Sequence, residues 1–184
     1  TYMRIIVTGG AGFLGSHLVD ALLSRGDTVI GLDSLITGSS DNLLHLKGNP
    51  RFSFTRGHVE EVGWSEFPTL DAVYHLASLA SPDAYWKHPT ETALAGSVGT
   101  MKAIELAIRH KATLLFTSSS EVYGNAAVVP QPESYWGNVN PIGVRAAYDE
   151  GKRFSEALIA SAVRNGQLRA RIVRLFNSYG PRMN

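Results

Sequence analysis

The stretch that decides the fold is Arg4–Leu18, which reads RIIVTGGAGFLGSHL. Its first five residues are nearly all apolar, which favours a strand covered on both faces of a parallel sheet. A helical pattern begins directly afterwards at Phe13, and the turn between them holds glycines in GxxGxxG spacing: Gly9, Gly12 and Gly15. Such a turn bends tightly, lets the backbone approach a diphosphate and packs the helix closely on the strand, while the helix N-terminus offers free N–H groups. The stretch therefore predicts a dinucleotide-binding turn.

The rest of the chain alternates short β-rich runs with helical patterns. The predicted strands are Arg4–Thr8, Thr28–Leu32, Phe52–Thr55, Ala72–Leu76, Thr113–Thr117 and Arg171–Phe176. The predicted helices are Phe13–Ser24, Glu91–His110 and Arg145–Arg164. This alternation is typical of a Rossmann-type α/β fold with a doubly wound parallel sheet. The stretch Gly124–Pro141, rich in proline, asparagine and aromatic residues, is predicted to be a long ordered loop.

An acidic residue, Asp33, ends the second predicted strand, 18 positions after Gly15. A carboxylate at this place accepts hydrogen bonds from the adenosine ribose hydroxyls and repels a 2′-phosphate, so the pattern favours NAD over NADP. The alternative is that the glycines form only a tight strand-to-helix connection. The strand, the helix and the acidic residue together favour the nucleotide site.

Tyr148 and Lys152 lie four positions apart, so on a helix they share one face. A nearby ammonium stabilises phenolate and lowers the pKa of a tyrosine, which makes the pair a proton-transfer group. The alternative is an interfacial tyrosine beside a surface lysine. The polar run Ser118–Glu121 follows the fifth predicted strand, and ligands of doubly wound sheets bind at the carboxyl ends of strands. We therefore expect both features at one crevice.

Composition excludes several classes of function. The chain has 184 residues and no cysteine, so neither disulfides nor cysteine-ligated zinc can form, and no metal site is predicted. Its net charge is +1 with scattered basic residues, which argues against nucleic-acid binding. No apolar run approaches the roughly 20 residues of a membrane span, and the N-terminal residues enter a strand directly. We expect one NAD-binding domain, residues 1–184, in a cytoplasmic protein without a membrane partner.

With these motifs, the chain resembles the extended short-chain dehydrogenase/reductases that act on nucleotide sugars, and among them the UDP-glucuronate decarboxylases. The resemblance extends from Arg4 to Met183. Beyond the glycine turn it is carried by the segments His75–Ser78, Ser120–Gly124, Tyr135–Gly143, Tyr148–Arg153 and Phe176–Met183. The third and fourth of these are the most particular to the decarboxylases.

The resemblance implies a reaction and a role for each matching residue. Tyr148 would take the proton of the sugar C4 hydroxyl, Lys152 would bind the nicotinamide ribose, and Ser119 would hydrogen-bond the C4 oxygen. Glu121 would assist decarboxylation and reprotonation, and Asn177 would approach the diphosphate of the UDP-sugar. The implied NAD-binding residues are Gly9, Gly12, Phe13, Leu14, Asp33, Ser34, Thr37, Gly38, Val59, Leu76, Ser78, Tyr148, Lys152 and Ser178. A homodimer paired through the two long helices is also implied.

Glu121 separates this chain from related enzymes, because epimerases carry a small or hydroxyl residue there and 4,6-dehydratases carry an Asp-Glu pair. Its alternative is a solvated carboxylate after a strand. A UDP-sugar 4-epimerase and a non-catalytic NAD-binding module remain alternative functions; the latter is favoured by departures from the family pattern at Ser39, His58 and Leu94. The chain ends at Asn184, where the resembled enzymes continue. We therefore expect the small C-terminal substrate domain to be largely missing and these residues alone to be a weak catalyst.

Overall fold

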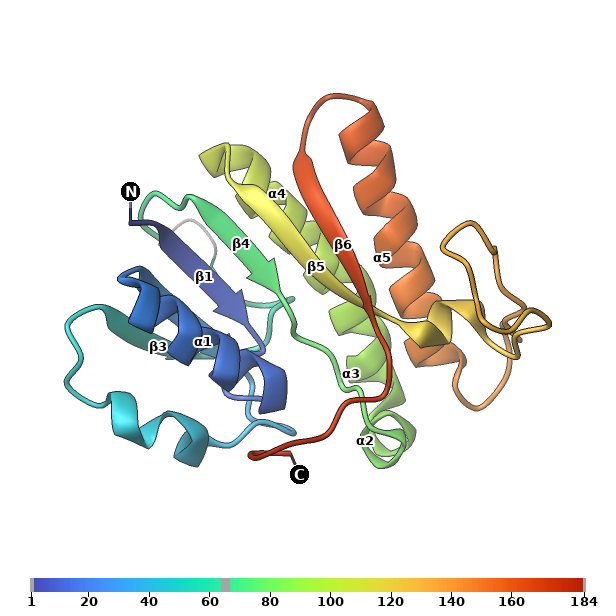
Figure 1. The fold of residues 1–184 in the computed structure, drawn as a ribbon, viewed down its shortest axis with the longest axis horizontal. Coiled ribbons are helices and arrows are strands. Elements are labelled where there is room, and N and C mark those ends of the chain that lie inside the picture. Colours follow the sequence, from blue (N-terminus) through green and yellow to red (C-terminus); the bar gives the residue numbers. More distant parts are fainter. Residues whose placement is uncertain (1, 64–66, 184) are drawn as a thin grey trace.

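A computed structural model describes residues 2–63 and 67–183. In these residues six parallel strands form one sheet in the order β3-β2-β1-β4-β5-β6, so the predicted doubly wound Rossmann-type fold is confirmed (Figure 1). The strands are β1 (Arg4–Thr8), β2 (Thr28–Asp33), β3 (Phe52–Arg56), β4 (Ala72–His75), β5 (Thr113–Ser119) and β6 (Arg169–Leu175).

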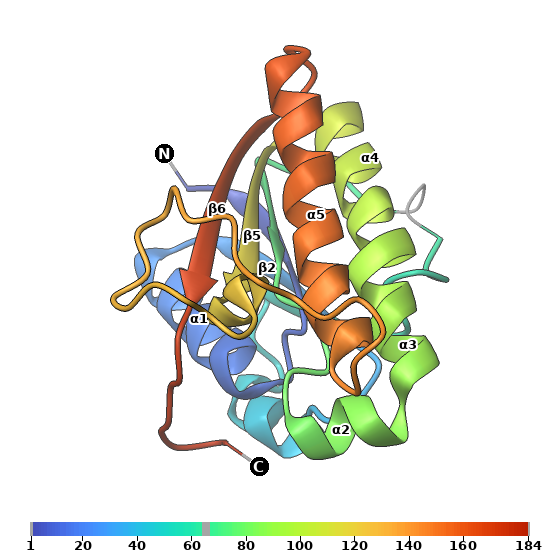
Figure 2. The same ribbon diagram turned by 90° about the vertical axis from the view of Figure 1, so that its right-hand side faces the viewer.

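Helices cover both faces of the sheet. Helix α1 (Phe13–Arg25) lies on one face, and α4 (Thr100–His110) and α5 (Ala146–Arg164) lie on the other (Figures 1 and 2). Side chains alternate along β1 as the pleat requires. Ile5 and Val7 join the core under α1, whereas Ile6 between them joins the core under α4 and α5. This two-sided burial explains why the strand has three consecutive apolar residues at its centre.

The remaining helices are short. They are α2 (Pro82–Lys87), α3 (Pro89–Leu94), a π-helical turn over Ala95–Gly99, and 3₁₀ helices over Ser40–Leu46 and Ser120–Tyr123. The predicted helix Glu91–His110 is thus α3, the π turn and α4 in succession, and it begins two residues earlier, at Pro89. Helix α2 was not predicted, although Pro82 stands at a first-turn position that proline favours.

Two boundaries affect the site. Strand β5 continues to Ser119, two residues beyond the predicted end, so that residue is held by the sheet rather than by a loop. Strand β4 stops at His75, one residue early. Strands β1 and β4 are neighbours, but the chain continues from β1 to β2 at one edge of this pair and from β4 to β5 at the other. This reversal of strand order opens a crevice at the carboxyl ends of the strands.

The predicted loop Gly124–Pro141 is irregular, as expected, and is fixed to the body of the protein. A parallel bridge joins Gly124 to Asn138, and one guanidinium nitrogen of Arg153 on α5 donates to the carbonyl oxygens of Val122 and Trp136.

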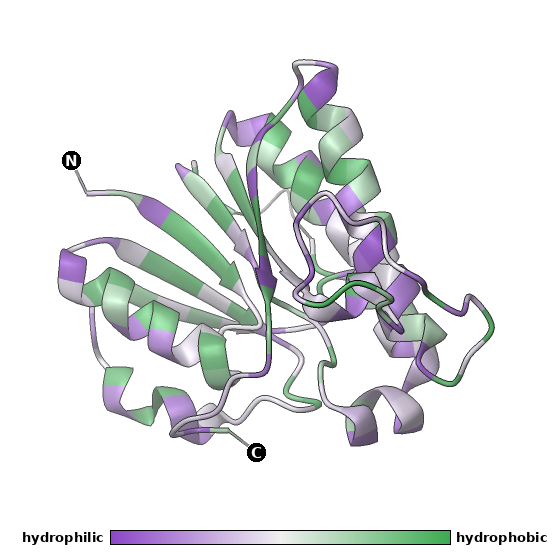
Figure 3. Ribbon diagram, turned by 45° about the vertical axis from the view of Figure 1, so that its right-hand side comes forward, coloured by the Kyte–Doolittle hydropathy of each residue, from purple (hydrophilic) through white to green (hydrophobic). Residues whose placement is uncertain are grey.

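Apolar residues gather in the strands and on the helix faces turned toward them (Figure 3). No helix in the described part of the chain is long and apolar enough to cross a membrane.

Candidate active site

A cavity of about 530 Å³ opens at the carboxyl ends of the strands. It brings together residues that the sequence had predicted from seven separate parts of the chain. Those that line it are Gly9, Gly12, Phe13, Leu14, Asp33, Ser34, Thr37, Val59, Leu76, Ser78, Ser119, Glu121, Tyr148, Lys152, Asn177 and Ser178. Of the predicted site residues, Gly38 does not line the cavity. It lies behind Asp33, where an added Cβ would stand 2.8 Å from a carboxylate oxygen.

The glycine turn has the shape that a diphosphate requires. Gly9 has a positive φ of 72°, and a Cβ on Gly15 would stand 1.9 Å from the carbonyl oxygen of Gly9. A Cβ on Gly12 would meet only that oxygen within 4 Å, at 3.2 Å, so the residue faces open space in the cavity. The N-terminus of α1 has no side-chain cap and no acidic residue in its first turn. The turn therefore offers room and a positive helix end to an anionic group.

Asp33 is fixed at the end of β2. One carboxylate oxygen accepts the N–H of Ala11 at 3.0 Å, and the other accepts the N–H of Leu35 at 2.9 Å. Each carboxylate oxygen can accept more than one hydrogen bond, so capacity for hydroxyl donors remains. Together with the glycine turn, this carboxylate fits an adenosine diphosphate group.

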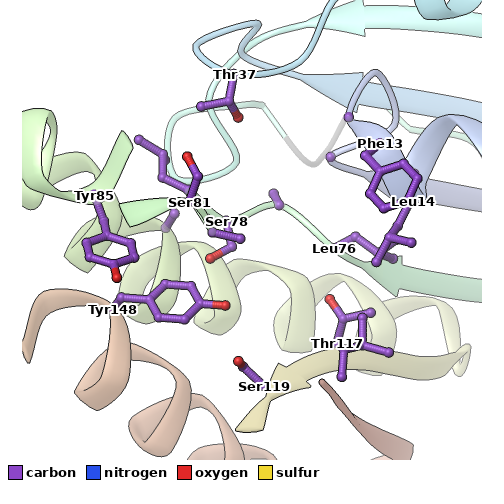
Figure 4. A pocket seen from close by; sticks show the side chains of 18 of the residues that line it. Phe13, Leu14, Thr37, Leu76, Ser78, Ser81, Tyr85, Thr117, Ser119 and Tyr148 are labelled. Carbon is purple, nitrogen blue, oxygen red and sulfur yellow. The ribbon is translucent and has the colours of Figure 1, made fainter. Parts of the chain in front are cut away.

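Tyr148 projects from the first turn of α5 into the cavity and is only 6% exposed. Its ring stacks on that of Tyr85 from α2, with centroids 5.3 Å apart and planes at 17°. The hydroxyls of Tyr148 and Ser119 are directed into the same part of the cavity (Figure 4). Burial raises the pKa of Tyr148, and the hydrogen bond with Ser119 opposes that rise. Tyr85, which holds this ring, was missed because the helix that carries it was missed.

The expectation that Lys152 lowers the pKa of Tyr148 is wrong for this structure. The amine of Lys152 donates to the carbonyl oxygen of Thr117 at 2.7 Å and lies 5.7 Å from the centre of the Tyr148 ring. Burial lowers the pKa of Lys152 to about 7 and raises that of Tyr148. Loss of water around both groups disfavours their charged forms.

Glu121 lies at the same end of the cavity and has a cationic partner. Its carboxylate is paired with the guanidinium of Arg145, the residue that precedes α5. The Nε of Arg145 also lies 4.0 Å from an oxygen of Asp149, which is 7% exposed. Glu121 is therefore an ion-paired carboxylate whose side chain is 27% exposed. Arg145 was not singled out from the sequence.

A buried chain of hydrogen bonds runs beneath the cavity. His75 contacts the hydroxyl of Thr8 through Nδ1 at 2.8 Å and that of Thr100 through Nε2 at 3.2 Å. Thr100 contacts Ser155 on α5 at 2.7 Å. Burial lowers the pKa of His75 to about 3, so its ring is neutral near pH 7. The network ties the sheet under the glycine turn to the helix that carries Tyr148.

Beyond the end of β6, Asn177 and Ser178 also line the cavity, and the hydroxyl of Ser178 donates to the carbonyl oxygen of Phe176 at 3.0 Å. His58, one of the departures from the family pattern, also lines the cavity, and its Nδ1 lies 3.5 Å from a carboxylate oxygen of Glu60. In the described residues no group of three or more histidine, cysteine or acidic side chains is arranged to hold a metal ion.

Comparison with known proteins assigns this arrangement to a family. Residues 5–184 match the NAD dependent epimerase/dehydratase family. The chain belongs to this family. Among curated members it is 52% identical to UDP-glucuronic acid decarboxylase 6 of Arabidopsis thaliana over 183 residues, and 45% identical to UDP-glucuronic acid decarboxylase 1 of Xenopus tropicalis over 181 residues. These matches cover 99% and 98% of the chain but 52% and 42% of the relatives. The chain thus spans about half the length of the relatives.

Solved structures of the family have the same fold. UDP-N-acetylglucosamine 4-epimerase of Methanobrevibacter ruminantium superposes with a TM-score of 0.87 at 28% identity, covering 100% of this chain and 58% of that one. The dTDP-glucose 4,6-dehydratase of Streptomyces venezuelae, solved with NAD bound, gives 0.87 at 31% identity, with 98% and 58% covered. The family therefore includes enzymes of three reaction types built on this domain.

Proposed function

We propose that this chain is the NAD-binding part of an enzyme that converts UDP-glucuronate to UDP-xylose and CO₂. The observation that carries the proposal is the position of Glu121, which lines the same cavity as Tyr148 and Ser119. The hydroxyls of these two residues are directed into that cavity (Figure 4). The names of the curated relatives at about half identity support the same reaction.

The proposed nucleotide site uses the glycine turn and Asp33. Gly9, Gly12 and the N-terminus of α1 would hold the diphosphate of NAD, and Asp33 would accept the adenosine ribose hydroxyls. Lys152, beside Tyr148, would hold the nicotinamide ribose. When bound there, NAD would supply a hydride acceptor for the oxidation at the sugar C4 and a hydride donor for the final reduction. The other predicted cofactor residues line the same cavity or, for Gly38, support Asp33.

The proposed proton chemistry belongs to the residues at the other end of the cavity. Tyr148 takes the proton of the C4 hydroxyl as C4 becomes a ketone, and Ser119 hydrogen-bonds the C4 oxygen. The carboxylate on C5 is then β to a carbonyl, so the bond between C5 and the carboxylate carbon breaks and its electron pair moves toward the C4 oxygen. Glu121 assists this loss of CO₂ and the addition of a proton from solvent to C5, where the proton replaces the lost carboxylate. Tyr148 finally returns its proton, and no net oxidation results.

A 4-epimerase is the second candidate, favoured by the structural likeness to epimerases. The two reactions need different sugars, because decarboxylation requires a uronate. The test is to incubate the longest natural form of the protein with NAD⁺ and either UDP-glucuronate or UDP-glucose, and to analyse the nucleotide products by mass spectrometry and chromatography. Formation of UDP-xylose supports the proposal. Formation of UDP-galactose, with UDP-glucuronate unchanged, would establish the epimerase, and bound NAD without any product would establish a binding module.

We also propose that the natural protein is a homodimer paired through α4 and α5. Large apolar side chains lie partly exposed on these helices: Met101, Ile108, Phe154 and Val163. Burial of such side chains between two copies is favourable. Light scattering at micromolar concentration should give twice the mass of the chain used, and a monomeric mass would contradict the proposal.

A further inference from the structure

Two separate elements bring the proposed proton-transfer groups to the cavity. Tyr148 lies in the first turn of α5, whereas Glu121 lies in the 3₁₀ helix Ser120–Tyr123, which follows β5. Helix α5 is joined to β5 by Lys152, whose amine donates to the carbonyl oxygen of Thr117. This contact does not reach the 3₁₀ helix, so the position of that helix relative to Tyr148 depends on other side chains.

Arg174 of β6 contacts both α5 and the 3₁₀ helix. Its Nε and Nη2 donate to the two carboxylate oxygens of Glu156 on α5, at 2.9 and 2.6 Å. Its Nη1 donates to the hydroxyl of Tyr123 at 2.7 Å and to the carbonyl oxygen of Glu133, in the loop that follows, at 3.1 Å. The guanidinium also lies over the Tyr123 ring, 4.9 Å from its centre. One side chain therefore binds groups from three separate parts of the chain.

This junction is largely shielded from solvent. The side chains of Arg174 and Glu156 are 25% and 16% exposed, and Tyr123 is 2% exposed. Burial alone would raise the pKa of Glu156, but hydrogen bonding to Arg174 lowers it, so the carboxylate is ionised near pH 7. A two-pronged pair of arginine and carboxylate has a fixed geometry. The pair is therefore suited to holding elements in position.

The two ends of the 3₁₀ helix are held by different contacts. At its start, the hydroxyl of Ser119 accepts the N–H of Glu121 at 3.2 Å, and Ser119 itself pairs with Leu175 in the sheet. At its end, the ring and the hydroxyl of Tyr123 contact Arg174. Glu121 thus lies between a strand end that is fixed by the sheet and a ring that is fixed by Arg174.

We propose that Arg174 is a positioning residue that holds Glu121 in place relative to Tyr148. Arg174 does not line the cavity, and it acts through Glu156 on the helix of the tyrosine and through Tyr123 beside the acid. This inference rests on the proposed function, in which Tyr148 serves the oxidation at C4 and Glu121 serves the loss of CO₂. Loosening the junction should therefore slow the second step more than the first.

The test separates the two steps in a single turnover. The longest natural form of the protein, with NAD⁺ bound, is mixed with UDP-glucuronate, and the absorbance of NADH and the released CO₂ are followed together. Arg174→Gln should slow the release of CO₂ about 10- to 100-fold and leave both NADH formation and the KM for UDP-glucuronate within about threefold. NADH should then accumulate together with a sugar that is oxidised at C4 and still carries its carboxylate.

Three further variants define the contact. Tyr123→Phe removes the hydroxyl contact, leaves the pair of Arg174 with Glu156 intact, and should slow the release of CO₂ by about 3- to 10-fold. Adding Arg174→Gln to Tyr123→Phe should cost less than it does in the wild type. Arg174→Lys keeps the charge without the two-pronged geometry and should be intermediate. Arg171→Gln, which changes an exposed arginine of the same strand, should alter neither step.

A second measurement needs no substrate. In the nucleotide-free protein, Arg174→Gln and Tyr123→Phe should speed amide hydrogen exchange in residues 120–124, and Arg171→Gln should not. Equal slowing of both steps, a change confined to KM, or unchanged exchange would overturn the proposal. If the thermal midpoint shows that Arg174→Gln unfolds, Tyr123→Phe decides by the same ratio of rates. A wild type that forms UDP-xylose beside variants that slow both steps equally contradicts this inference alone, whereas a wild type that leaves UDP-glucuronate unchanged contradicts the proposed function as well.

Discussion

The amine of Lys152 donates a hydrogen bond of 2.7 Å to the carbonyl oxygen of Thr117, joining α5 to the end of β5. The same amine lies 4.9 Å from the centre of the Phe116 ring. A lysine in this position is surrounded by protein rather than by water, and its pKa falls to about 7. In the nucleotide-free chain near pH 7, the buried amine of Lys152 is therefore protonated in only part of the molecules.

This burial predicts how stability depends on pH. Between about pH 7 and 9 the unfolded chain keeps a proton on Lys152 that the folded chain has partly released. Since the unfolded state binds more protons, the free energy of unfolding should rise with pH in this window, by up to about 1.4 kcal/mol per pH unit. Urea unfolding of the nucleotide-free chain at several pH values measures the slope.

The control for that slope is a pair of variants. Lys152→Met should remove most of the dependence, and Lys102→Met, which changes a partly exposed lysine on α4, should keep it. Equal slopes in the wild type and Lys152→Met would show that the buried amine does not release its proton.

The stack of Tyr85 on Tyr148 predicts a role for α2. Tyr85 is 2% exposed, so Tyr85→Ala would leave a void beside Tyr148 and should lower the free energy of unfolding by about 3–5 kcal/mol. Tyr85→Phe keeps the ring and should stay within about 1 kcal/mol of the wild type. Urea denaturation compares the two variants. A cost for Phe as large as that for Ala would mean that the hydroxyl, and not the stacked ring, carries the effect.

The geometry of the glycine turn predicts different effects for alanine substitutions at Gly12 and Gly15. Gly15→Ala places a Cβ against the carbonyl oxygen of Gly9 and should destabilise the fold by about 3 kcal/mol. Gly12→Ala points into open space and should cost about 1 kcal/mol or less. It should nevertheless weaken NAD⁺ binding at least about tenfold, because the added methyl group occupies the path of the diphosphate. Unchanged NAD⁺ affinity in a folded Gly12→Ala variant would place the diphosphate elsewhere.

The sequence predicted the parts of the fold that depend on local patterns. The apolar run Arg4–Thr8 and the glycines after it mark a strand, a turn and a helix start, and the structure places all three as expected. Topology then accounts for the gathering of Tyr148 with Ser119 and Glu121, since carboxyl ends of parallel strands meet at one edge. Helix α2 escaped prediction because a six-residue helix gives too short a pattern for periodicity to reveal.

What the sequence missed depends on contacts between distant residues. Nothing in the spacing of Glu121 and Arg145 indicates that they pair, and nothing around His75 indicates a hydrogen-bonded chain that reaches Ser155. The direction of the pKa shift of Tyr148 was also misjudged, because a helical spacing of four does not tell how deeply the pair is buried. These features follow from tertiary packing alone.

The central claim is that Tyr148 performs proton transfer in the decarboxylation of a UDP-uronate. The most direct measurement incubates the longest natural form of the protein with NAD⁺ and UDP-glucuronate, beside Tyr148→Phe, and follows the nucleotide product and CO₂ by mass spectrometry. We predict that the wild type converts UDP-glucuronate to a nucleotide lighter by one CO₂ without accumulating NADH, and that Tyr148→Phe binds NAD⁺ normally but loses at least about 99% of this activity. An unchanged rate in Tyr148→Phe, or an unaltered UDP-glucuronate with the wild type, would contradict the claim.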